Sequence, residues 1–123
     1  DFVSSVGLPD YGITNTGSVT SEGDSVLLAA QARTAFGVDG SGVKVGVISN
    51  GVEHWSISEA SGDLPSSVDV LKTGSGDEGT AMLEIIHDLA PGASLAFYGS
   101  SSSSDMLVGI GALEAAGCNV IVD

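Results

Sequence analysis

The chain has 123 residues, 42% of them hydrophobic, and a formal net charge of -13 at pH 7. This length and hydrophobic content suffice for one core, and the 18 glycines with few aromatic residues favour tight turns around an α/β sheet over a helical bundle. Only Arg33, Lys44 and Lys72 are positive, so the chain repels nucleic-acid phosphates and anionic membranes, and we expect neither as a partner.

The chain divides into an amino-terminal segment and one folded unit. Residues 1–23 are rich in serine, threonine and glycine and show no sustained hydrophobic period, which predicts an arm or linker. We assign residues 24–123 to one domain or to part of one. Its apolar pattern begins at Val26 and predicts a helix from Asp24 to a stop at Gly37.

The first strand is predicted from Val43 to Ser49, between the turn Gly40-Ser41-Gly42 and the dipeptide Asn50-Gly51. The connection from Gly51 to Gly76 has a mixed pattern that contains one further short strand, Val68–Leu71.

The second long helix is predicted to begin at Glu78 and to end before Pro91-Gly92. Residues at helical spacing are expected to face the core, and these are Met82, Ile85, Ile86 and Leu89. The segments that follow are a strand at Ala93–Tyr98, a flexible loop at residues 100–104, a helix at Asp105–Ala116 that starts with Asp105, and a strand at Val120–Val122. In the last helix, one apolar face is expected, made of Met106, Leu107, Ile110 and Leu113.

This alternation of strands and helices predicts an α/β fold with three layers, in which a mostly parallel sheet is flanked by helices. Functional sites in such folds lie beyond the carboxyl ends of the strands. Glu78 is a candidate because it stands at the head of a helix. On its own, however, such a carboxylate can be a helix-start residue, stabilised by the helix dipole by roughly 0.3–1 kcal/mol.

Three motifs follow one another along the chain, namely Gly40 to Gly51, Glu78 to Ala93, and Cys118 to Asp123. Together they resemble the subtilisin/sedolisin superfamily of serine peptidases, and most closely its sedolisin-like branch. The stretch Gly40 to Gly51 resembles the first core strand, which in the superfamily ends in a catalytic Asp, whereas position 50 here is Asn. Glu78-Gly79-Thr80 stands where subtilisins have His-Gly-Thr, and a Glu before a helix that leads into Leu-Ala-Pro-Gly-Ala is the sedolisin arrangement. Cys118 to Asp123 resembles the next core strand.

The resemblance implies that Glu78 is the general base, which takes the proton of a nucleophilic Ser and needs a pKa raised by burial or a like charge. Sedolisins orient this Glu with an Asp one helical turn later, where this chain has Met82, so the orienting role falls to Asn50. The loop residues Ser100, Ser101 and Ser102 are the expected substrate-binding residues.

The nucleophilic Ser of this superfamily lies in a Gly-Thr-Ser type motif, which is not found in these residues. The resemblance therefore implies the amino-terminal part of a serine endopeptidase domain, with a subtilisin-like fold that is incomplete in this chain. We expect the chain alone to be inactive and not to fold as an independent unit. The expected partners are a peptide or protein substrate and the complementary C-terminal part of the domain, and the expected location is secreted or extracellular. No metal or cofactor is assigned here, and the resemblance allows calcium only in the complete domain.

Asn50 leaves several explanations open: natural loss of function, an engineered inactivation, deamidation to Asp before Gly51, or simply a turn residue. A catalytically inactive subtilisin-like binding or surface-interaction module is therefore the alternative function. A nucleotide-binding domain is disfavoured, because the glycines Gly40 and Gly42 precede a strand instead of following one.

Three other features have ordinary structural interpretations. Cys118 is the only cysteine, so it forms no disulfide within the chain and is expected to be a small buried side chain. Glu84 and His87 form an isolated Glu-x-x-His pair, which we interpret as solvated polar residues near the helix end. His54 and Trp55 follow the first strand motif and could line a cleft, although such a pair is most often a surface patch.

Overall fold

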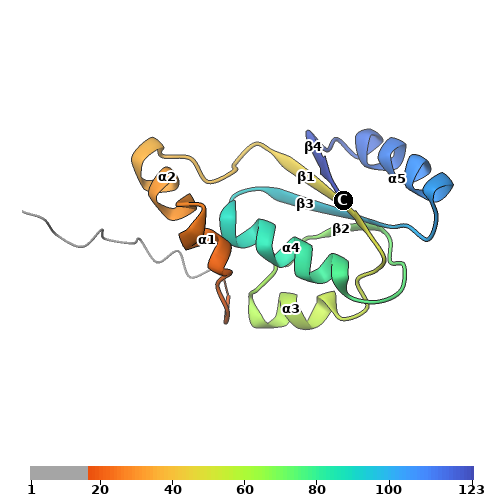
Figure 1. Cartoon of the computed structure of the whole chain (residues 1–123), viewed down its shortest axis with the longest axis horizontal. Helices are drawn as coiled ribbons and strands as arrows, with labels where there is room; N and C mark the ends of the chain where they lie inside the picture. The colour runs from red at the N-terminus through yellow and green to blue at the C-terminus, as the bar shows by residue number, and fades with distance from the viewer. Residues whose placement is uncertain (1–16) are drawn as a thin grey trace, which may run out of the picture.

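Four parallel strands form one sheet at the centre of the fold (Figure 1). The structure is a computed structural model that describes residues 17–123, so most of the expected arm lies outside the described residues. The strands are β1 (Lys44–Ser49), β2 (Asp69–Lys72), β3 (Ser94–Gly99) and β4 (Val120–Val122). They pair in the order β2-β3-β1-β4, and every pair is parallel. The predicted α/β class and parallel sheet are thereby confirmed.

The central strands β1 and β3 bury side chains on both faces, as expected where helices cover a parallel sheet on both sides. On one face, Val47 and Phe97 are completely buried in the first of two hydrophobic clusters. On the other face, Ile48 and Ala96 belong to the second cluster. Because neighbouring residues alternate between the faces, these apolar runs specify two cores at once.

Helices cover both faces of the sheet. Helices α3 (Trp55–Ser61) and α4 (Glu78–Leu89) pack on the first cluster, and α5 (Ser103–Ala115) packs on the second (Figure 1). In α4 the completely buried residue is Leu83, whereas Ile85, predicted to face the core, is 46% exposed. The start of α4 explains the difference: a Cβ at Gly79 would lie 2.3 Å from the Phe97 ring, so α4 approaches the sheet through its glycine side.

Helices α3 and α5 differ from the sequence-based expectation. Helix α3 lies in the segment that was predicted only as a mixed connection, and it ends at Gly62, which has a φ of 84°. Helix α5 starts earlier than predicted, because the Ser102 hydroxyl, and not Asp105, is its cap and accepts a hydrogen bond from Asp105 N at 3.2 Å. Of its predicted apolar face, Leu113 is buried, but Leu107 is 72% exposed.

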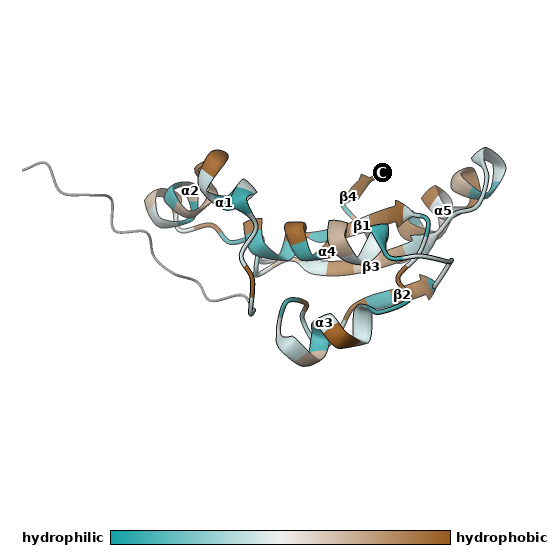
Figure 2. Cartoon of the chain, turned by 60° about the horizontal axis from the view of Figure 1, so that its bottom comes forward, coloured by the Kyte–Doolittle hydropathy of each residue, from teal (hydrophilic) through white to brown (hydrophobic). Residues whose placement is uncertain are grey.

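Apolar side chains are exposed on α5 and on the edge strand β4. Leu107, Val108 and Val120 are exposed there, and Figure 2 shows hydrophobic residues on both elements. In the described part of the chain, β4 pairs only with β1, so its outer backbone groups are open to another strand. The expectation that the chain is not an independent folding unit stays a prediction.

The segment predicted as one helix from Asp24 to Gly37 is two helices, α1 (Glu22–Val26) and α2 (Ala29–Phe36). The break is at Leu28, which has a left-handed φ of 58°. Few side chains hold this pair to the domain: α1 buries none, and α2 buries only Ala30. Polar contacts must therefore fasten both helices.

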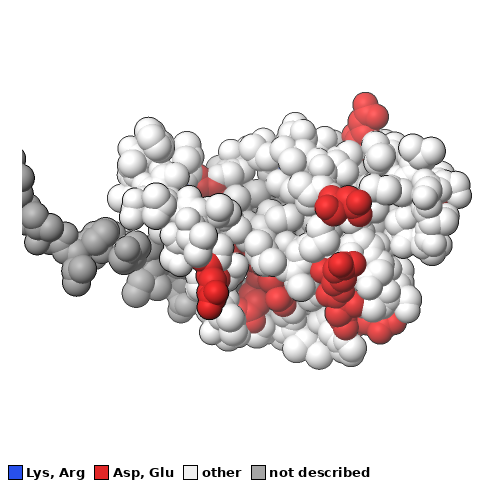
Figure 3. All heavy atoms as spheres, viewed as in Figure 1, with Lys and Arg blue, Asp and Glu red and all other residues white. Residues whose placement is uncertain are grey.

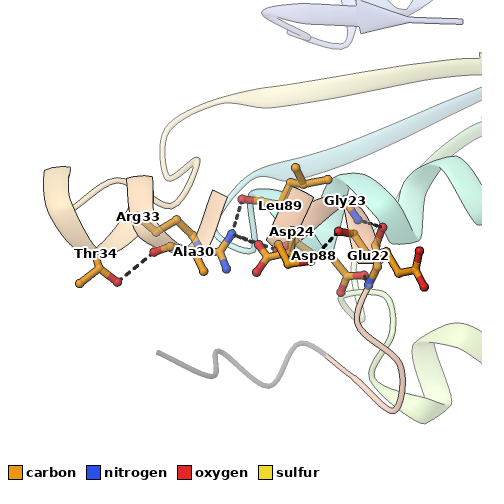
Figure 4. Close-up of polar contacts among 10 residues, drawn as sticks. Glu22, Gly23, Asp24, Ala30, Arg33, Thr34, Asp88 and Leu89 are labelled. Carbon is orange, nitrogen blue, oxygen red and sulfur yellow. Dashed lines mark hydrogen bonds and ion pairs between the residues drawn. The ribbon is translucent and has the colours of Figure 1, made fainter. Parts of the chain in front are cut away.

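Arg33 provides these contacts at the carboxyl end of α4 (Figure 4). Its Nη1 donates to Asp24 Oδ1 at 2.6 Å and to the carbonyl of Leu89 at 2.8 Å. Asp88 adds a second connection, since its Oδ2 accepts from Ser21 N at 2.5 Å. The guanidinium thus neutralises Asp24 and the negative end of the α4 dipole together.

The face of the molecule drawn in Figure 3 shows acidic side chains and no lysine or arginine.

We predict that Arg33→Met releases α1 and α2 while the sheet stays folded. The side chains of Arg33 and Asp24 are only 11% and 13% exposed, so the substitution leaves an unpaired, largely buried carboxylate. Breaking such a pair costs about 3 kcal/mol or more, which corresponds to roughly a hundredfold in local opening. Hydrogen exchange should show faster exchange in residues 22–36 and unchanged protection in β1 and β3.

The matched control is Lys44→Met, which removes the more exposed ion pair with Asp69. It should change exchange by less than about tenfold, because such pairs contribute about 1 kcal/mol or less. Equal exchange of α1 and α2 in Arg33→Met and in the parent would show that the ion pair does not fasten them.

Candidate functional site at the carboxyl edge of the sheet

The carboxyl ends of β1 and β3 lie side by side in parallel register. The chain leaves β1 toward α3 on one face of the sheet and leaves β3 toward α5 on the other (Figure 1). Connections that diverge in this way open a crevice in which α/β proteins bind ligands. Asn50 and Ser100, two of the predicted site residues, directly follow these strands. The glycines Gly40 and Gly42 precede β1 and so stand at the opposite edge.

The loop of residues 73–76 packs tightly against the end of β1. Ser75 N donates to the Asn50 carbonyl at 2.8 Å, and Val52 N donates to the Thr73 carbonyl at 3.0 Å. Gly74 has a φ of 68°, and a Cβ there would lie 2.0 Å from the Asn50 carbonyl oxygen. Only glycine permits this approach, so Gly74 sets how closely the loop meets β1.

Glu78 is the first residue of α4, and its carboxylate reaches back to the end of β1. Ser49 Oγ donates to Glu78 Oε2 at 2.9 Å. Asn50 Oδ1 accepts from the backbone N of Glu78 at 3.2 Å and so satisfies one of the free N–H groups at the helix start. The expectation that Asn50 orients the Glu78 side chain is therefore wrong in detail: Ser49 holds the carboxylate, and Asn50 holds the main chain.

A cavity of about 300 Å³ lies beside Asn50. Small polar residues and one lysine line it, namely Asn50, Lys72, Gly74, Ser75, Gly99, Ser100 and Ser101. The structure thus brings Asn50, Ser100 and Ser101 together. Ser102 and Glu78 are not among the lining residues, because Ser102 caps α5 and the Glu78 carboxylate binds Ser49.

Lys72 is held at this cavity by residues of β3 and α5. Its Nζ donates to Asp105 Oδ2 at 2.5 Å and lies 5.0 Å from the centre of the Tyr98 ring. Asp105 also accepts from Ser101 N at 3.0 Å and from the Tyr98 hydroxyl at 3.0 Å. The bond from Lys72, followed by that from Ser101 N, lowers the pKa of Asp105 to about 2, and the same ion pair raises the pKa of Lys72.

A histidine and a carboxylate pair lies next to Glu78. His54 Nδ1 lies 2.5 Å from Asp77 Oδ2, and His54 N donates to Asp77 Oδ1 at 2.7 Å. With Glu53, these two side chains place three ligand atoms within 4.8 Å of one another, so this group could hold a metal ion. A histidine nitrogen suits transition metals better than calcium, which prefers oxygen ligands. Calcium in the complete domain stays a prediction.

A second cavity, of about 400 Å³, lies away from these residues, between residues 19–21, the end of α3 and α4. Its carboxylates are already bonded. Ser61 Oγ, Val19 N and Ser18 Oγ all donate to Asp63, and these bonds lower its pKa to about 2. Glu84 accepts from Ser58 Oγ at 2.5 Å. This cavity therefore offers a ligand no free charged group from Asp63 or Glu84.

The other candidates of the sequence analysis have structural surroundings. Met82 packs against the first hydrophobic cluster, in the position where sedolisins are expected to have an acid. His87 is half-buried and not solvated as expected, and its Nδ1 is buried without a hydrogen-bond partner among the described residues. Cys118 is half-buried against the second cluster, where burial raises its pKa.

Three residues of this edge were missed by the sequence analysis: Ser49, Lys72 and Asp77. Ser49 could have been found, because it ends β1 and therefore shares the carboxyl edge with Asn50. Asp77 precedes Glu78 directly, but nothing in the sequence pairs it with His54, which is 23 positions away. Lys72 depends on the placement of β2 next to β3, which periodicity alone does not give.

Comparison of the chain with protein-family models, curated proteins and solved structures gives no match. Within residues 17–123, no helix has the length and apolar character needed to cross a bilayer. The function must therefore be argued from the site itself.

We predict that the two histidines titrate on opposite sides of the ordinary value of 6.5. The hydrogen bond and charge of Asp77 raise the pKa of His54, whereas burial lowers the pKa of His87. The His54 pair therefore stabilises the fold below its unfolded pKa and loses this contribution as pH rises through the folded pKa. Conversely, stability from neutral His87 is lost as pH falls below 6.5.

The measurement is an NMR titration of both imidazole rings in the parent and in Asp77→Asn. The substitution should bring the pKa of His54 down toward 6.5 and leave that of His87 unchanged. An unchanged His54 titration in Asp77→Asn would contradict the pairing.

Proposed function

We propose that residues 24–123 form the amino-terminal part of a serine endopeptidase domain of the subtilisin/sedolisin superfamily, of the sedolisin-like type. The observation that carries this proposal is the position of Glu78. Its carboxylate stands at the start of α4, bonded to Ser49 at the end of β1, at the sheet edge where a ligand crevice forms. Glu78 is exposed, so the burial expected of the base is not met within the described residues. The α/β sheet with helices on both faces is compatible with a subtilisin-like fold.

In this proposal Glu78 acts as the general base. Ser49 donates to Oε2, which leaves Oε1 to accept the proton of a nucleophilic serine. The serine oxygen then bonds the peptide carbonyl carbon, the amine leaves with the proton returned by Glu78, and water hydrolyses the acyl-enzyme. The nucleophile and the oxyanion hole come from residues outside this chain. Its partners are thus a peptide or protein substrate and the complementary C-terminal part of the domain, in a secreted protein.

A catalytically inactive binding module with the same fold is the second candidate, and two observations favour it. Asn50 supplies a neutral amide where the superfamily has an acid, and Met82 packs on the hydrophobic core where sedolisins have a supporting Asp. A neutral amide gives no charge that could stabilise a protonated partner.

We predict that Glu78→Gln lowers kcat/KM for peptide hydrolysis by the complete protein by about 10²–10⁴, the usual contribution of a general base. Glu53→Gln is the matched control: Glu53 is also an exposed carboxylate at this edge, but it bonds Ser75 Oγ instead of Ser49. It should retain activity. Equal activities of the two variants would remove Glu78 from the mechanism and leave it as a helix-start residue.

We further predict that Asn50→Asp raises activity, most clearly at acidic pH. The new carboxylate would lie beside Glu78 at the start of α4, and two neighbouring carboxylates can share one proton. Peptide hydrolysis is compared across pH for parent and variant, after intact mass has shown whether Asn50 of the parent is already deamidated. An inactive parent and an inactive Asn50→Asp variant would favour the binding module.

A further inference from the structure

The cavity beside Asn50 is lined by a basic residue, although the chain as a whole is acidic. The sequence has 16 acidic and 3 basic residues, yet the only charged residue among those that line this cavity is Lys72. The other two basic residues lie elsewhere: Arg33 binds the end of α4, and Lys44 starts β1 at the opposite edge of the sheet. Lys72 is therefore the one lysine or arginine at the carboxyl edge, where the other basic group, His54, pairs with Asp77.

The cavity also has hydrogen-bond donors in excess. The Lys72 ammonium has three N–H groups: Asp105 accepts from one, and the Tyr98 side chain also interacts with the ammonium. Asn50 uses Oδ1 to accept from Glu78 N, and no described residue accepts a hydrogen bond from its Nδ2. Asp105 itself is not a lining residue. A ligand that fills this space must bring acceptors to Lys72 and Asn50.

We propose that this cavity binds a carboxylate group. The two oxygens of a carboxylate can accept from the Lys72 ammonium and the Asn50 amide together, and a charge-assisted bond of this kind is stronger than one between neutral groups. A cationic side chain would meet the ammonium and be repelled. Resting on the proposed peptidase function, the cavity is then the subsite for an Asp or Glu side chain of the peptide substrate, and Lys72 is its specificity-determining residue.

The environment of Lys72 makes it suited to this role. The bond to Asp105 and the Tyr98 ring fix the position of the ammonium, so a ligand does not have to order a free lysine. The ion pair also lowers the net charge at the cavity. Lys72→Met should therefore abolish carboxylate binding.

The first experiment measures binding by NMR on the complete protein at pH 7. The probes are N-acetylglutamic acid α-amide, whose only carboxylate is that of the side chain, and its neutral isostere N-acetylglutamine α-amide. The glutamate probe should shift the amide resonances of Gly74, Gly99 and Ser100. The affinity for the glutamine probe should be lower by a factor of about ten or more. The shifts should be lost in Lys72→Met and kept in Lys44→Met, the matched loss of a strand lysine that pairs with an aspartate. Equal binding of the two probes, or unchanged shifts in Lys72→Met, would overturn the proposal.

The second experiment compares kcat/KM of the complete protein for peptides that differ by Glu, Gln or Lys at one position. The parent should prefer Glu over Gln by about tenfold, and Lys72→Glu should prefer Lys. Carboxylate binding without hydrolysis would contradict the proposed peptidase function but support the carboxylate site. Hydrolysis without any preference for an acidic residue would contradict the proposed subsite but support the peptidase function.

Discussion

Asn50 joins the end of β1 to two other segments, and the geometry of the carboxyl edge depends on these bonds. Its backbone carbonyl accepts from Ser75 N, and its side-chain carbonyl accepts from Glu78 N. The first bond holds the loop before α4 against β1, and the second fixes where α4 begins. Ser49 directly precedes Asn50, and the Ser49 hydroxyl therefore lies within hydrogen-bond distance of the Glu78 carboxylate. Asn50 is also one of the residues that line the cavity.

Close backbone contacts make this edge rigid. A Cβ at Gly99 would lie 2.4 Å from Gly74 N, and one at Gly76 would lie 2.9 Å from Asn50 Nδ2. These glycines let two strand ends and one loop approach more closely than side chains would permit. The edge is thus preorganised by its main chain, and the few functional side chains project from fixed positions.

Much of the fold follows from the sequence. The apolar runs of β1 and β3 predict buried parallel strands, and Pro91-Gly92 marks the end of α4. Tertiary contacts decide the rest. The close approach of Gly79 to Phe97 makes Leu83, and not Ile85, the buried residue of α4. The left-handed Leu28 divides a predicted helix in two, and Arg33 of the second helix binds the end of α4.

The sequence predicts which residues lie at the candidate site better than it predicts their hydrogen-bond partners. Strand ends place Asn50, Ser100 and Ser101 at one edge, because parallel strands share their carboxyl side. The partner of each side chain depends on distances that periodicity does not give. Thus Ser49 and not Asn50 holds the Glu78 carboxylate, Ser102 caps α5 and does not line the cavity, and Lys72 enters the site only because β2 pairs with β3.

The central claim is that Glu78 activates a serine nucleophile. The most direct test is labelling of the complete protein with a fluorophosphonate, which reacts with activated serines, followed by mass spectrometry of the modified peptide. Our account predicts one labelled serine, outside these 123 residues, with labelling lost in Glu78→Gln and kept in Glu53→Gln. No labelling of the parent, or equal labelling in both variants, would contradict it.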